Sequence, residues 1–488
     1  MIEKRDIDFL RSYLADSSNL KGGYADALLV PGNFEELASV LTRANREGTG
    51  ITVSGGGTGT SGGRIPFGGV IVSTEKLNSI GAAADGRVTA DCGVMIKDLK
   101  SHIARNGYFY SYDPTEQTAF VGGTVATNAS GARSFKYGPT RASVIGLKIA
   151  LASGSVLDIK RGEVREKGGI LRFKAGSKEY TVPVPAYEMP KVKSSAGYYA
   201  SRGMDLVDLF IGQEGTLGVI LQATLKLLKM PGDMLSCFAF FTADDNALAF
   251  AQEARELSYE KRSKGGPGID AVSLEYFDFH TIGLLKERYG GVPGASAACV
   301  FFEQEIDGGD EDRLLDRWVA LMSKYGAEPE NTWVAMNEAE RAELLEKRHA
   351  MGEAMNEMAR RNNMPKVATD IAVPHTVFPE MMECYRRELS GCGIEHYLFG
   401  HIGDSHIHMN LIPRDPEELG RAKEISLIFI KKAVSIGGTV SAEHGIGKTR
   451  REYLKLLYGE NGIKQMIEVK RALDPGMILS PGNIFEVR

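Results

Sequence analysis

The chain has 488 residues, 43% of them hydrophobic and 25% charged, as in ordinary globular proteins, and this length fits two or three domains. Its 58 Lys and Arg residues stand against 63 Asp and Glu residues, and no basic run interleaved with aromatic residues indicates a nucleic-acid partner. No stretch reaches the roughly 20 apolar residues of a membrane span, so we expect a cytoplasmic protein, at most peripheral to a membrane.

The first part of the chain alternates helices and strands. One predicted helix starts at Asn33 with a capping-box-like pattern and ends at Gly48, and a second helix, apolar on one face, ends at Gly107. Strands are predicted at 51–54, 69–73, 87–91, 144–152 and 215–228. This order indicates an α/β arrangement for this part.

A loop almost free of side chains, Ser54-Gly-Gly-Gly-Thr-Gly-Thr-Ser-Gly-Gly63, follows the strand at 51–54. Its glycines match the spacing of a dinucleotide fingerprint, but the next element is another strand and not the helix that a nicotinamide site requires. Consecutive N–H groups from Ser54 to Gly59 can form a nest for a pyrophosphate. The loop alone also fits a glycine-rich hairpin that binds nothing.

The middle and last parts of the chain predict a different organisation. Residues 113–147 are rich in Gly, Ala, Ser, Thr and Asn, which lets the backbone approach a flat or charged group, and Pro231-Gly232 suggests a domain boundary near residue 230. Beyond it, strand-like runs alternate with helical patterns, as in α+β folds. The strands are predicted at 237–241, 297–302 and 397–400, and the helices at 245–257, 311–324, 338–361, 417–436 and 450–473.

Four of the nine histidines lie in two segments near the end of the chain, His401-Ile-Gly-Asp-Ser-His-Ile-His-Met-Asn410 and Ser441-Ala-Glu-His-Gly-Ile-Gly-Lys448. On a strand after the turn, His406, His408 and Asn410 share one face. His401 and His408 with Glu443 make a two-histidine, one-carboxylate set that can hold a metal with open positions, and His444 can act as a base. The alternative is that these histidines are hydrogen-bonded structural residues.

Seven segments, in order, resemble FAD-linked D-2-hydroxyacid dehydrogenases of the vanillyl-alcohol oxidase and p-cresol methylhydroxylase (PCMH) superfamily, which includes D-lactate, glycolate and D-2-hydroxyglutarate dehydrogenases. The likeness covers nearly the whole chain. The segments are Val53-Ser-Gly-Gly-Gly-Thr58, Asp113-Pro114, Gly122-Gly-Thr with Asn128-Ala-Ser-Gly131, Gly212-Gln-Glu-Gly-Thr-Leu-Gly-Val-Ile220, His401 to Asn410, Ser441 to Gly447, and Leu473-Asp-Pro-Gly476 with Pro481-Gly482.

The resemblance implies an α+β fold: a two-subdomain, PCMH-type FAD-binding domain at 1–230, an α+β cap domain with an antiparallel sheet at 231–440, and a segment at 441–488 that returns to the FAD domain and completes the active site. FAD is expected to be non-covalent, because the 54–63 loop has no His or Cys for attachment. The residues expected to bind it are Ser54, Gly55, Gly56, Gly57, Thr58, Gly59, Pro114, Gly122, Gly123, Thr124, Asn128, Gly131, Gly218, Val219 and Ile220.

The same likeness implies the chemistry. His401, His408 and Glu443 correspond to ligands of a divalent metal, for which we expect zinc or manganese, and His444 to the base that removes the hydroxyl proton of a 2-hydroxy acid. Arg348 resembles the arginine of a Trp-x-x-Arg element that grips the substrate carboxylate, with Asn410 as a second contact.

The sequence departs from relatives at three places. Relatives read Gly-Asp-Gly-Asn where this chain has Gly403-Asp-Ser-His406, so His406 is either an additional ligand or a side chain that crowds the pocket. Leu345 replaces the expected Trp, and Ala368-Thr-Asp370 lacks the lysine of relatives that handle dicarboxylates. These features favour a short monocarboxylate, D-lactate or glycolate, with D-2-hydroxyglutarate as the alternative.

Two other functions stay open at this stage: a transferase like alkyl-dihydroxyacetonephosphate synthase, and a subunit that retains FAD without turnover. The five cysteines have no iron–sulfur spacing, so the electrons of a dehydrogenase must leave to an external acceptor, which we expect to be a quinone, an electron-transfer flavoprotein or a cytochrome. A homodimer is compatible with the sequence, which does not specify the oligomeric state.

Overall fold

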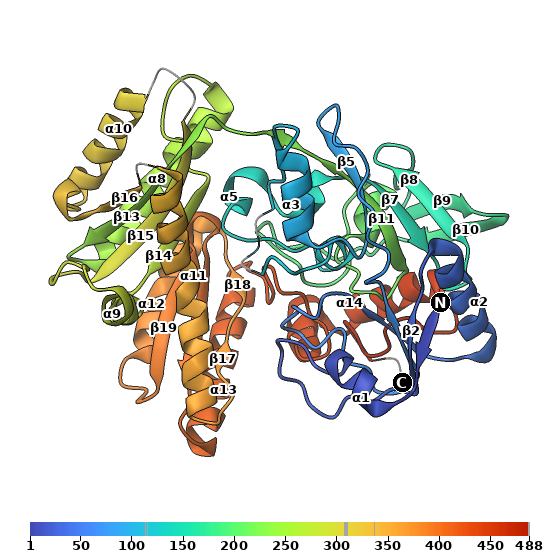
Figure 1. Ribbon diagram of the computed structural model, residues 1–488. Helices are drawn as coiled ribbons and strands as arrows, with labels where there is room; N and C mark the ends of the chain where they lie inside the picture. Colours follow the sequence, from blue (N-terminus) through green and yellow to red (C-terminus); the bar gives the residue numbers. More distant parts are fainter. Residues whose placement is uncertain (113, 115, 307–310, 336, 487–488) are drawn as a thin grey trace.

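The computed structural model describes residues 1–112, 114, 116–306, 311–335 and 337–486. Two lobes lie side by side (Figure 1). The first contains the N-terminal half and both ends of the chain, and the second contains the large sheet with α8 to α13. Within the described ranges, no helix is both long enough and apolar enough to cross a bilayer.

The first sheet of the N-terminal lobe is mixed. Its order is β1-β2-β4-β3, with β2, β4 and β3 parallel and β1 antiparallel at the edge. The helix predicted after Asn33 is confirmed: the Asn33 side chain accepts from the N–H of Glu36, and Gly48 ends the helix at φ 67°. The bounds are β1 Ile2–Lys4, β2 Ala27–Val30, α2 Phe34–Glu47, β3 Ile51–Ser54 and β4 Val70–Ser73, with the short helices α1 Ile7–Leu10 and η1 Arg11–Tyr13 between β1 and β2.

The second sheet, of order β5-β11-β7-β8, is antiparallel throughout. The α/β arrangement predicted for this part is therefore correct only for the first sheet, because the partners in the second are brought together from distant parts of the chain. Its strands are β5 Arg87–Asp91, β7 Val144–Ala150, β8 Val156–Lys160 and β11 Val219–Lys226. The lobe is completed by α3 Ile96–Ala104, the pair β6 Tyr108–Phe109 and β12 Leu228–Lys229, the hairpin β9 Ile170–Ala175 and β10 Lys178–Pro183, and α7 Leu206–Phe210.

Short helices occupy the small-residue stretch at 113–147. They are α4 Val121–Ala126, α5 Ser134–Tyr137 and α6 Thr140–Ser143. Sequence patterns did not predict them, because α4 contains glycine and β-branched residues, which are weak helix formers, and α5 and α6 have only four residues each. In α4 the helical turn is held by tertiary contacts, since Gly122 packs against Cys92 with no room for a side chain.

The second lobe is built on an eight-stranded sheet of order β16-β13-β15-β14-β19-β20-β17, with β18 also paired to β20. All the pairings are antiparallel, so the expected α+β fold is confirmed. The strands are β13 Asp233–Phe241, β14 Ser273–Phe277, β15 Ala298–Ile306, β16 Trp333–Ala335, β17 Val367–Ala368, β18 Ile371–Ala372, β19 Glu395–His401 and β20 His406–Ile412. The helices are α8 Asp244–Lys264, α9 Phe279–Tyr289, α10 Glu311–Lys324, α11 Glu338–Arg361, α12 Phe378–Leu389 and α13 Pro416–Ser435.

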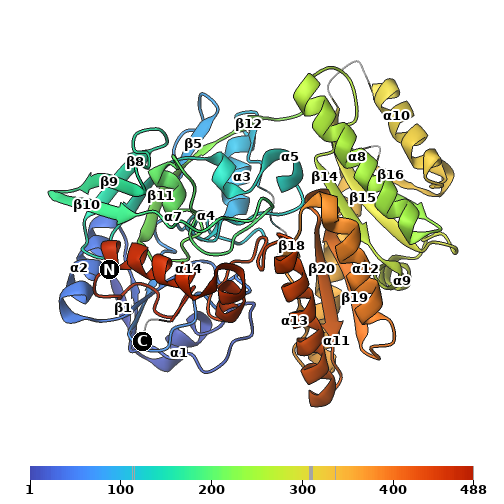
Figure 2. The same ribbon diagram turned by 180° about the vertical axis from the view of Figure 1, so that it is seen from behind.

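The end of the chain returns to the N-terminal lobe. Helix α14, Arg451–Leu473, lies in the same lobe as α2 in both views (Figure 1 and Figure 2). Beyond it, the N–H of Ile51 donates to the carbonyl of Ile478 at 2.7 Å, and the N–H of Ser480 donates to the carbonyl of Ile51 at 2.6 Å. We propose domain limits of 1–230, 231–440 and 441–488 on this arrangement.

Candidate active site

A cavity of about 390 Å³ opens where the two lobes meet the C-terminal segment, a volume within the usual range of ligand sites, about 300–1,000 Å³. The glycine loop, α4 and the start of β11 form one side, and Arg348, His401, Glu443 and His444 lie at the other. Most residues predicted to bind FAD line it: Gly55, Gly56, Gly57, Thr58, Gly59, Pro114, Gly122, Gly123, Thr124, Gly131, Gly218, Val219 and Ile220.

Two residues predicted to bind FAD are not among those that line the cavity. Ser54 ends β3 and is fully buried beneath the loop. Asn128 has a positive φ of 49°, and its side-chain oxygen accepts from the N–H of Arg141 at 3.1 Å. These contacts point to a role of both residues in shaping the loops. Asp113 lies outside the described residues.

The glycines of this region keep the cavity wide. A Cβ at Gly56 would lie 2.7 Å from the carbonyl oxygen of Thr118, and Gly57 has a φ of +80°, where side chains are strained. A Cβ at Gly59 or Gly123 would meet no protein atom within 4 Å, so a methyl there would take up cavity space. A bare backbone beside a cavity of this size fits a pyrophosphate and a flat ring system.

The histidine cluster is carried by the hairpin of β19 and β20. In the register of the two strands, His401 stands opposite His406, and Phe399 stands opposite His408. The ring centroids of His406 and His408 are 4.4 Å apart, and His401 lies 5.2 Å from the first and 5.6 Å from the second. The strand alternation predicted for this segment therefore brings three imidazoles together.

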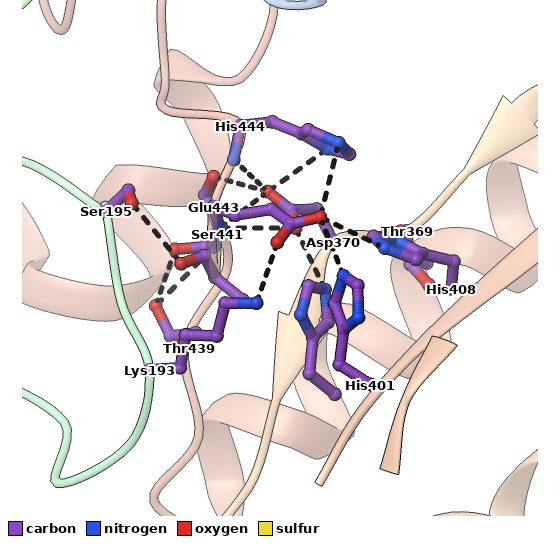
Figure 3. Close-up of polar contacts among 12 residues, drawn as sticks. Lys193, Ser195, Thr369, Asp370, His401, His408, Thr439, Ser441, Glu443 and His444 are labelled. Atoms are coloured by element: carbon purple, nitrogen blue, oxygen red, sulfur yellow. Dashed lines mark hydrogen bonds and ion pairs between the residues drawn. The ribbon is translucent and has the colours of Figure 1, made fainter. Parts of the chain in front are cut away.

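Glu443 lies at the centre of the polar cluster (Figure 3). Its Oε1 is 3.3 Å from the Nε2 atoms of both His401 and His408 and 3.8 Å from Nε2 of His444. Its Oε2 accepts from Nζ of Lys193 at 2.7 Å. Burial opposes the charge of Glu443, but Lys193 and His401 hold its pKa well below the usual value. The carboxylate is thus ionised and faces a group of imidazole nitrogens.

The hydrogen bonds of His401 and His408 determine which ring nitrogen faces Glu443. Nδ1 of His401 donates to Oε1 of Glu275 at 2.6 Å, and Nδ1 of His408 donates to the backbone carbonyl of Thr369 at 3.3 Å. A neutral imidazole with its proton on Nδ1 carries its lone pair on Nε2. Because Nδ1 of each ring is used in these bonds, Nε2 is the nitrogen that each ring turns toward Glu443, the orientation in which histidines bind a metal.

Glu275 is a site residue that the sequence did not indicate. It lies on β14 and is 1% exposed, and its Oε2 accepts from Nη2 of Arg348 at 2.7 Å. Burial opposes its charge, yet Arg348 and His401 lower its pKa strongly. The residues around Glu275, Ser273-Leu-Glu-Tyr-Phe277, form a fully buried strand whose sequence gives no sign of a polar role. Only the pairing of β14 with β19 places it beside His401.

Asp370 is a second polar residue that the sequence did not indicate, and it holds the segment that carries Glu443 and His444. Its carboxylate accepts from the hydroxyl of Ser441 at 2.7 Å, from the N–H of His444 at 2.9 Å and from Nη1 of Arg450 at 3.0 Å. The carboxylate oxygen that bonds Ser441 and Arg450 also lies 3.4 Å from Nδ1 of His444. Asp370 therefore fixes the backbone that presents Glu443 and His444.

His444 faces the cavity with a neutral ring. Burial lowers the pKa of His444 to about 4, which Asp370 opposes and Arg450 reinforces. Asp370 and Arg450 both lie 3.4 Å from its Nδ1 and favour opposite tautomers. A role as base at Nε2 requires the tautomer in which the Nδ1 proton faces Asp370.

The remaining predicted residues have different surroundings. Arg348 lines the cavity while it is bound to Glu275. Asn410 is buried on β20, where its side chain donates to the carbonyl of His408 at 3.4 Å, and it is not one of the lining residues. Its role as a substrate contact stays a prediction.

The donor set fits a divalent cation. One ligand atom from each of His401, His406, His408 and Glu443 lies within 4.8 Å of the others. Both ring nitrogens of His406 are buried without a hydrogen-bond partner, and burial lowers the pKa of His406 to about 3, so that its ring is neutral. Imidazoles with a carboxylate are the ligands that zinc and similar metals prefer.

Two family models match the chain. Residues 25–160 match the model described as FAD binding domain, and residues 259–484 match the model described as FAD linked oxidases, C-terminal domain. The chain is 29% identical to the glycolate oxidase subunit GlcD of Bacillus subtilis, over 97% of this chain and 92% of that protein. It is 28% identical to D-lactate dehydrogenase of Archaeoglobus fulgidus (93% and 90%) and 26% identical to D-2-hydroxyglutarate dehydrogenase of Xanthomonas citri pv. viticola (94% and 89%).

Solved structures share the fold at low sequence identity. A 4-ethylphenol oxidase from Gulosibacter chungangensis aligns with a TM-score of 0.70 at 17% identity, over 99% of this chain and 94% of that one. An alkyldihydroxyacetonephosphate synthase aligns with a TM-score of 0.69 at 16% identity, over 98% and 82%. At such identities the likeness establishes the fold alone.

Proposed function

Because the chain belongs to the FAD-linked oxidoreductases with a PCMH-type FAD-binding fold, we propose that it oxidises a D-2-hydroxy acid, D-lactate or glycolate, to the 2-oxo acid. The observation that carries the proposal is the convergence of His401 and His408 Nε2 on Oε1 of Glu443, at 3.3 Å each, beside a cavity lined by backbone glycines. This arrangement supports a cation site next to a cofactor site.

The glycine loop at Gly55 to Gly59 would hold the pyrophosphate of FAD, and α4 with the start of β11 would lie along the flavin. FAD supplies the acceptor for the hydride that leaves C2 of the substrate. A divalent cation held by His401, His408 and Glu443 supplies a positive charge that lowers the pKa of the substrate hydroxyl. Both groups fit the residues that face the cavity.

The side chains have separate tasks in this proposal. Nε2 of His444 takes the hydroxyl proton, with Asp370 holding the required tautomer through the Nδ1 proton. Arg348 lines the cavity and binds the substrate carboxylate, while Glu275 holds its guanidinium in place. Burial lowers the pKa of His444 to about 4, so its ring is unprotonated at neutral pH.

The preference for a small substrate with one carboxylate is based on the segment at 368–370. The segment at 368–370 offers a buried carboxylate that is already bound by Ser441 and Arg450, and not a lysine. The segment therefore supplies no positive charge for a second substrate carboxylate, the role that the resemblance gives to the lysine of relatives that handle dicarboxylates. The proposal therefore favours a monocarboxylate over D-2-hydroxyglutarate.

After the oxidation, the electrons of the reduced flavin pass to an external acceptor, which is a quinone, an electron-transfer flavoprotein or a cytochrome.

An anaerobic reduction panel tests the proposal. The FAD-loaded protein is mixed with D-lactate, L-lactate, glycolate or D-2-hydroxyglutarate, with and without a chelator, and the flavin absorbance is followed. We expect bleaching by D-lactate or glycolate, with slower bleaching after chelation. Bleaching by D-2-hydroxyglutarate alone would replace the substrate assignment, and a flavin that no 2-hydroxy acid bleaches would refute the dehydrogenase function.

The His444→Ala variant should still bind FAD, because the glycine loop is intact. Its flavin should no longer be reduced by the substrate at the parent rate, because the base is missing. We expect the anaerobic reduction rate to fall by about 10²–10⁴-fold, the usual contribution of a general base. His396→Ala is the matched control, since His396 lies on the same strand as His401 but faces the backbone carbonyl of Ile394. Equal rates in His444→Ala and the parent would remove His444 from the mechanism.

A further inference from the structure

We propose that His406 is a fourth protein ligand of the cation, completing a three-imidazole, one-carboxylate set with His401, His408 and Glu443. The inference rests on the proposed function for the existence of the cation site, and it concerns a residue that relatives replace by asparagine. It changes the kind of metal that the site selects.

The first support is the burial of His406 without a partner. The residue is 0% exposed at the start of β20, and neither ring nitrogen makes a hydrogen bond. Native proteins rarely leave a buried nitrogen without a partner, so such an atom requires an explanation. A bound cation would satisfy one nitrogen.

The second support is the position of the ring within the cluster. The strand register sets His406 opposite His401, and the His406 ring centroid lies 4.4 Å from that of His408. One ligand atom of each residue, with a Glu443 oxygen, lies within 4.8 Å of all the others. A cation with bonds of about 2.0–2.2 Å needs ligand atoms at most about 4.4 Å apart, so adjustments of a few tenths of an ångström close the set.

The competing role for His406 is that of a hydrogen-bond donor to Asp370. Its Nε2 lies 3.1 Å from Oδ1 of Asp370, but not in the alignment of a hydrogen bond. Asp370 already accepts from the hydroxyl of Ser441, the N–H of His444 and the guanidinium of Arg450. The carboxylate therefore does not depend on His406, and the imidazole is available to a cation.

A third imidazole favours metals that bind nitrogen well. Imidazole nitrogens are softer ligands than carboxylate or water oxygens. They therefore favour zinc, cobalt or iron over magnesium and calcium, which prefer oxygen ligands. With four protein ligands, a five- or six-coordinate cation still keeps positions for the substrate. The set would therefore hold its metal more tightly than two imidazoles and a carboxylate can.

The test measures the metal directly in the FAD-loaded protein. Zn²⁺ affinity is determined by competition with a coloured chelator, and the number of bound imidazoles is counted by X-ray absorption on the Zn²⁺ and Co²⁺ forms. His406→Asn introduces the residue of relatives, and His396→Asn is the matched control on β19. We expect three imidazoles in the parent and two in His406→Asn, with a Kd for Zn²⁺ raised at least 10-fold, and no change in His396→Asn.

Two imidazoles in the parent, or a His406→Asn variant with unchanged Kd and imidazole count, would overturn the inference. So would a parent that binds no Zn²⁺ or Co²⁺. The flavin spectrum of each variant reports folding, and the imidazole count of the parent tests the inference even where a variant fails to fold. Failure of the proposed function appears separately, as a flavin that no 2-hydroxy acid bleaches while the metal is bound.

Discussion

At the scale of single residues, the site depends on buried carboxylates that orient other side chains. Glu275 receives the Nδ1 proton of His401 on one oxygen and the guanidinium of Arg348 on the other. It thereby connects a proposed metal ligand to the residue proposed to grip the substrate. Asp370 likewise accepts from the backbone N–H of Glu443, and its carboxylate lies 3.4 Å from Nδ1 of His444.

Glu275→Gln should weaken metal binding without loss of FAD. The amide oxygen still accepts from His401, but the negative charge that supports the imidazole and pairs with Arg348 is gone. Changes to such outer partners usually cost about 10–100-fold in metal affinity. The Zn²⁺ Kd and the FAD content are the measurements, and Glu395→Gln, on the exposed start of β19, is the control. An unchanged Kd in Glu275→Gln would show that His401 does not need this carboxylate.

Glu214 gives a pH dependence to the stability of the apoprotein. Its carboxylate accepts from the N–H groups of Ile446 and Gly447, at 2.8 and 2.6 Å, but burial raises its pKa to about 7. Because the pKa of Glu214 is higher in the folded protein than in the unfolded chain, protonation of Glu214 stabilises the fold. This stabilisation is complete below the unfolded pKa, near 4.5, and is lost as the pH rises to the folded pKa, about 7. Glu214→Gln removes this titration.

The free energy of unfolding, measured in urea between pH 4.5 and 8, should therefore decline more steeply in the parent than in Glu214→Gln. At 1.36 kcal/mol per pKa unit, the difference in slope accumulates to an upper value of roughly 3 kcal/mol. Glu179→Gln, on the exposed face of β10, should follow the parent. Parallel curves for the parent and Glu214→Gln would contradict the assignment.

At the scale of elements, α4 shows how one short helix serves both packing and the cavity. A Cβ at Gly122 would lie 2.5 Å from Cβ of Cys92 and 3.0 Å from its carbonyl oxygen, whereas a Cβ at Gly123 would meet nothing within 4 Å. The two glycines are adjacent and both line the cavity. They are required for different reasons: Gly122 for its contact with Cys92, directly after β5, and Gly123 for the room that it leaves to a ligand.

Alanine at these two positions should have opposite effects on the apoprotein. Gly122→Ala overpacks the contact with Cys92 and should lower the free energy of unfolding by about 1–3 kcal/mol. Gly123→Ala should leave it unchanged or raise it by about 0.5–1 kcal/mol, because alanine is the better helix former, yet it should weaken FAD binding. Urea unfolding and FAD titration measure the two effects. Equal stabilities of the two variants would refute the packing argument.

At the scale of the whole molecule, two regions hold the lobes around the cavity. Helix α5 of the first lobe reaches the large sheet, where Arg133 pairs with Glu303 at 3.1 Å and Lys136 pairs with Asp270 at 2.9 Å. The C-terminal segment binds back to the first lobe after it has supplied Glu443 and His444. The cavity is therefore formed by three parts of the chain that must be docked together.

Lys470 holds the C-terminal segment against the first lobe. It is buried, and its Nζ donates to Asp474 at 2.8 Å and to the carbonyls of Thr216 and Leu479 at 2.8 and 2.9 Å. Lys470→Met would leave the buried Asp474 without its cationic partner and should cost about 3–5 kcal/mol of stability. Lys464→Met, on the exposed side of the same helix, should stay within about 0.5 kcal/mol of the parent. Urea unfolding of both variants is the measurement, and equal losses would contradict an anchoring role.

Local patterns alone determined much of this protein. The cap at Asn33, the strand after it, the glycine loop that leads to a strand, and the alternation of His406 and His408 all follow from interactions between residues close in sequence. The motif order also predicted the FAD-binding family and its fold, which the family models confirm. Such features are readable because backbone geometry and side-chain periodicity are short-range properties.

Tertiary structure decided which polar residues complete the cluster. Glu275, Asp370 and Lys193 are separated from the histidine segments by up to 250 residues in the chain, and no local pattern assigns them to the same site. Their contacts arise from strand pairing and from the docking of the C-terminal segment. The hydrogen bonds that choose the imidazole tautomers, and the burial that shifts the pKa of His444, exist only once these distant parts are packed together.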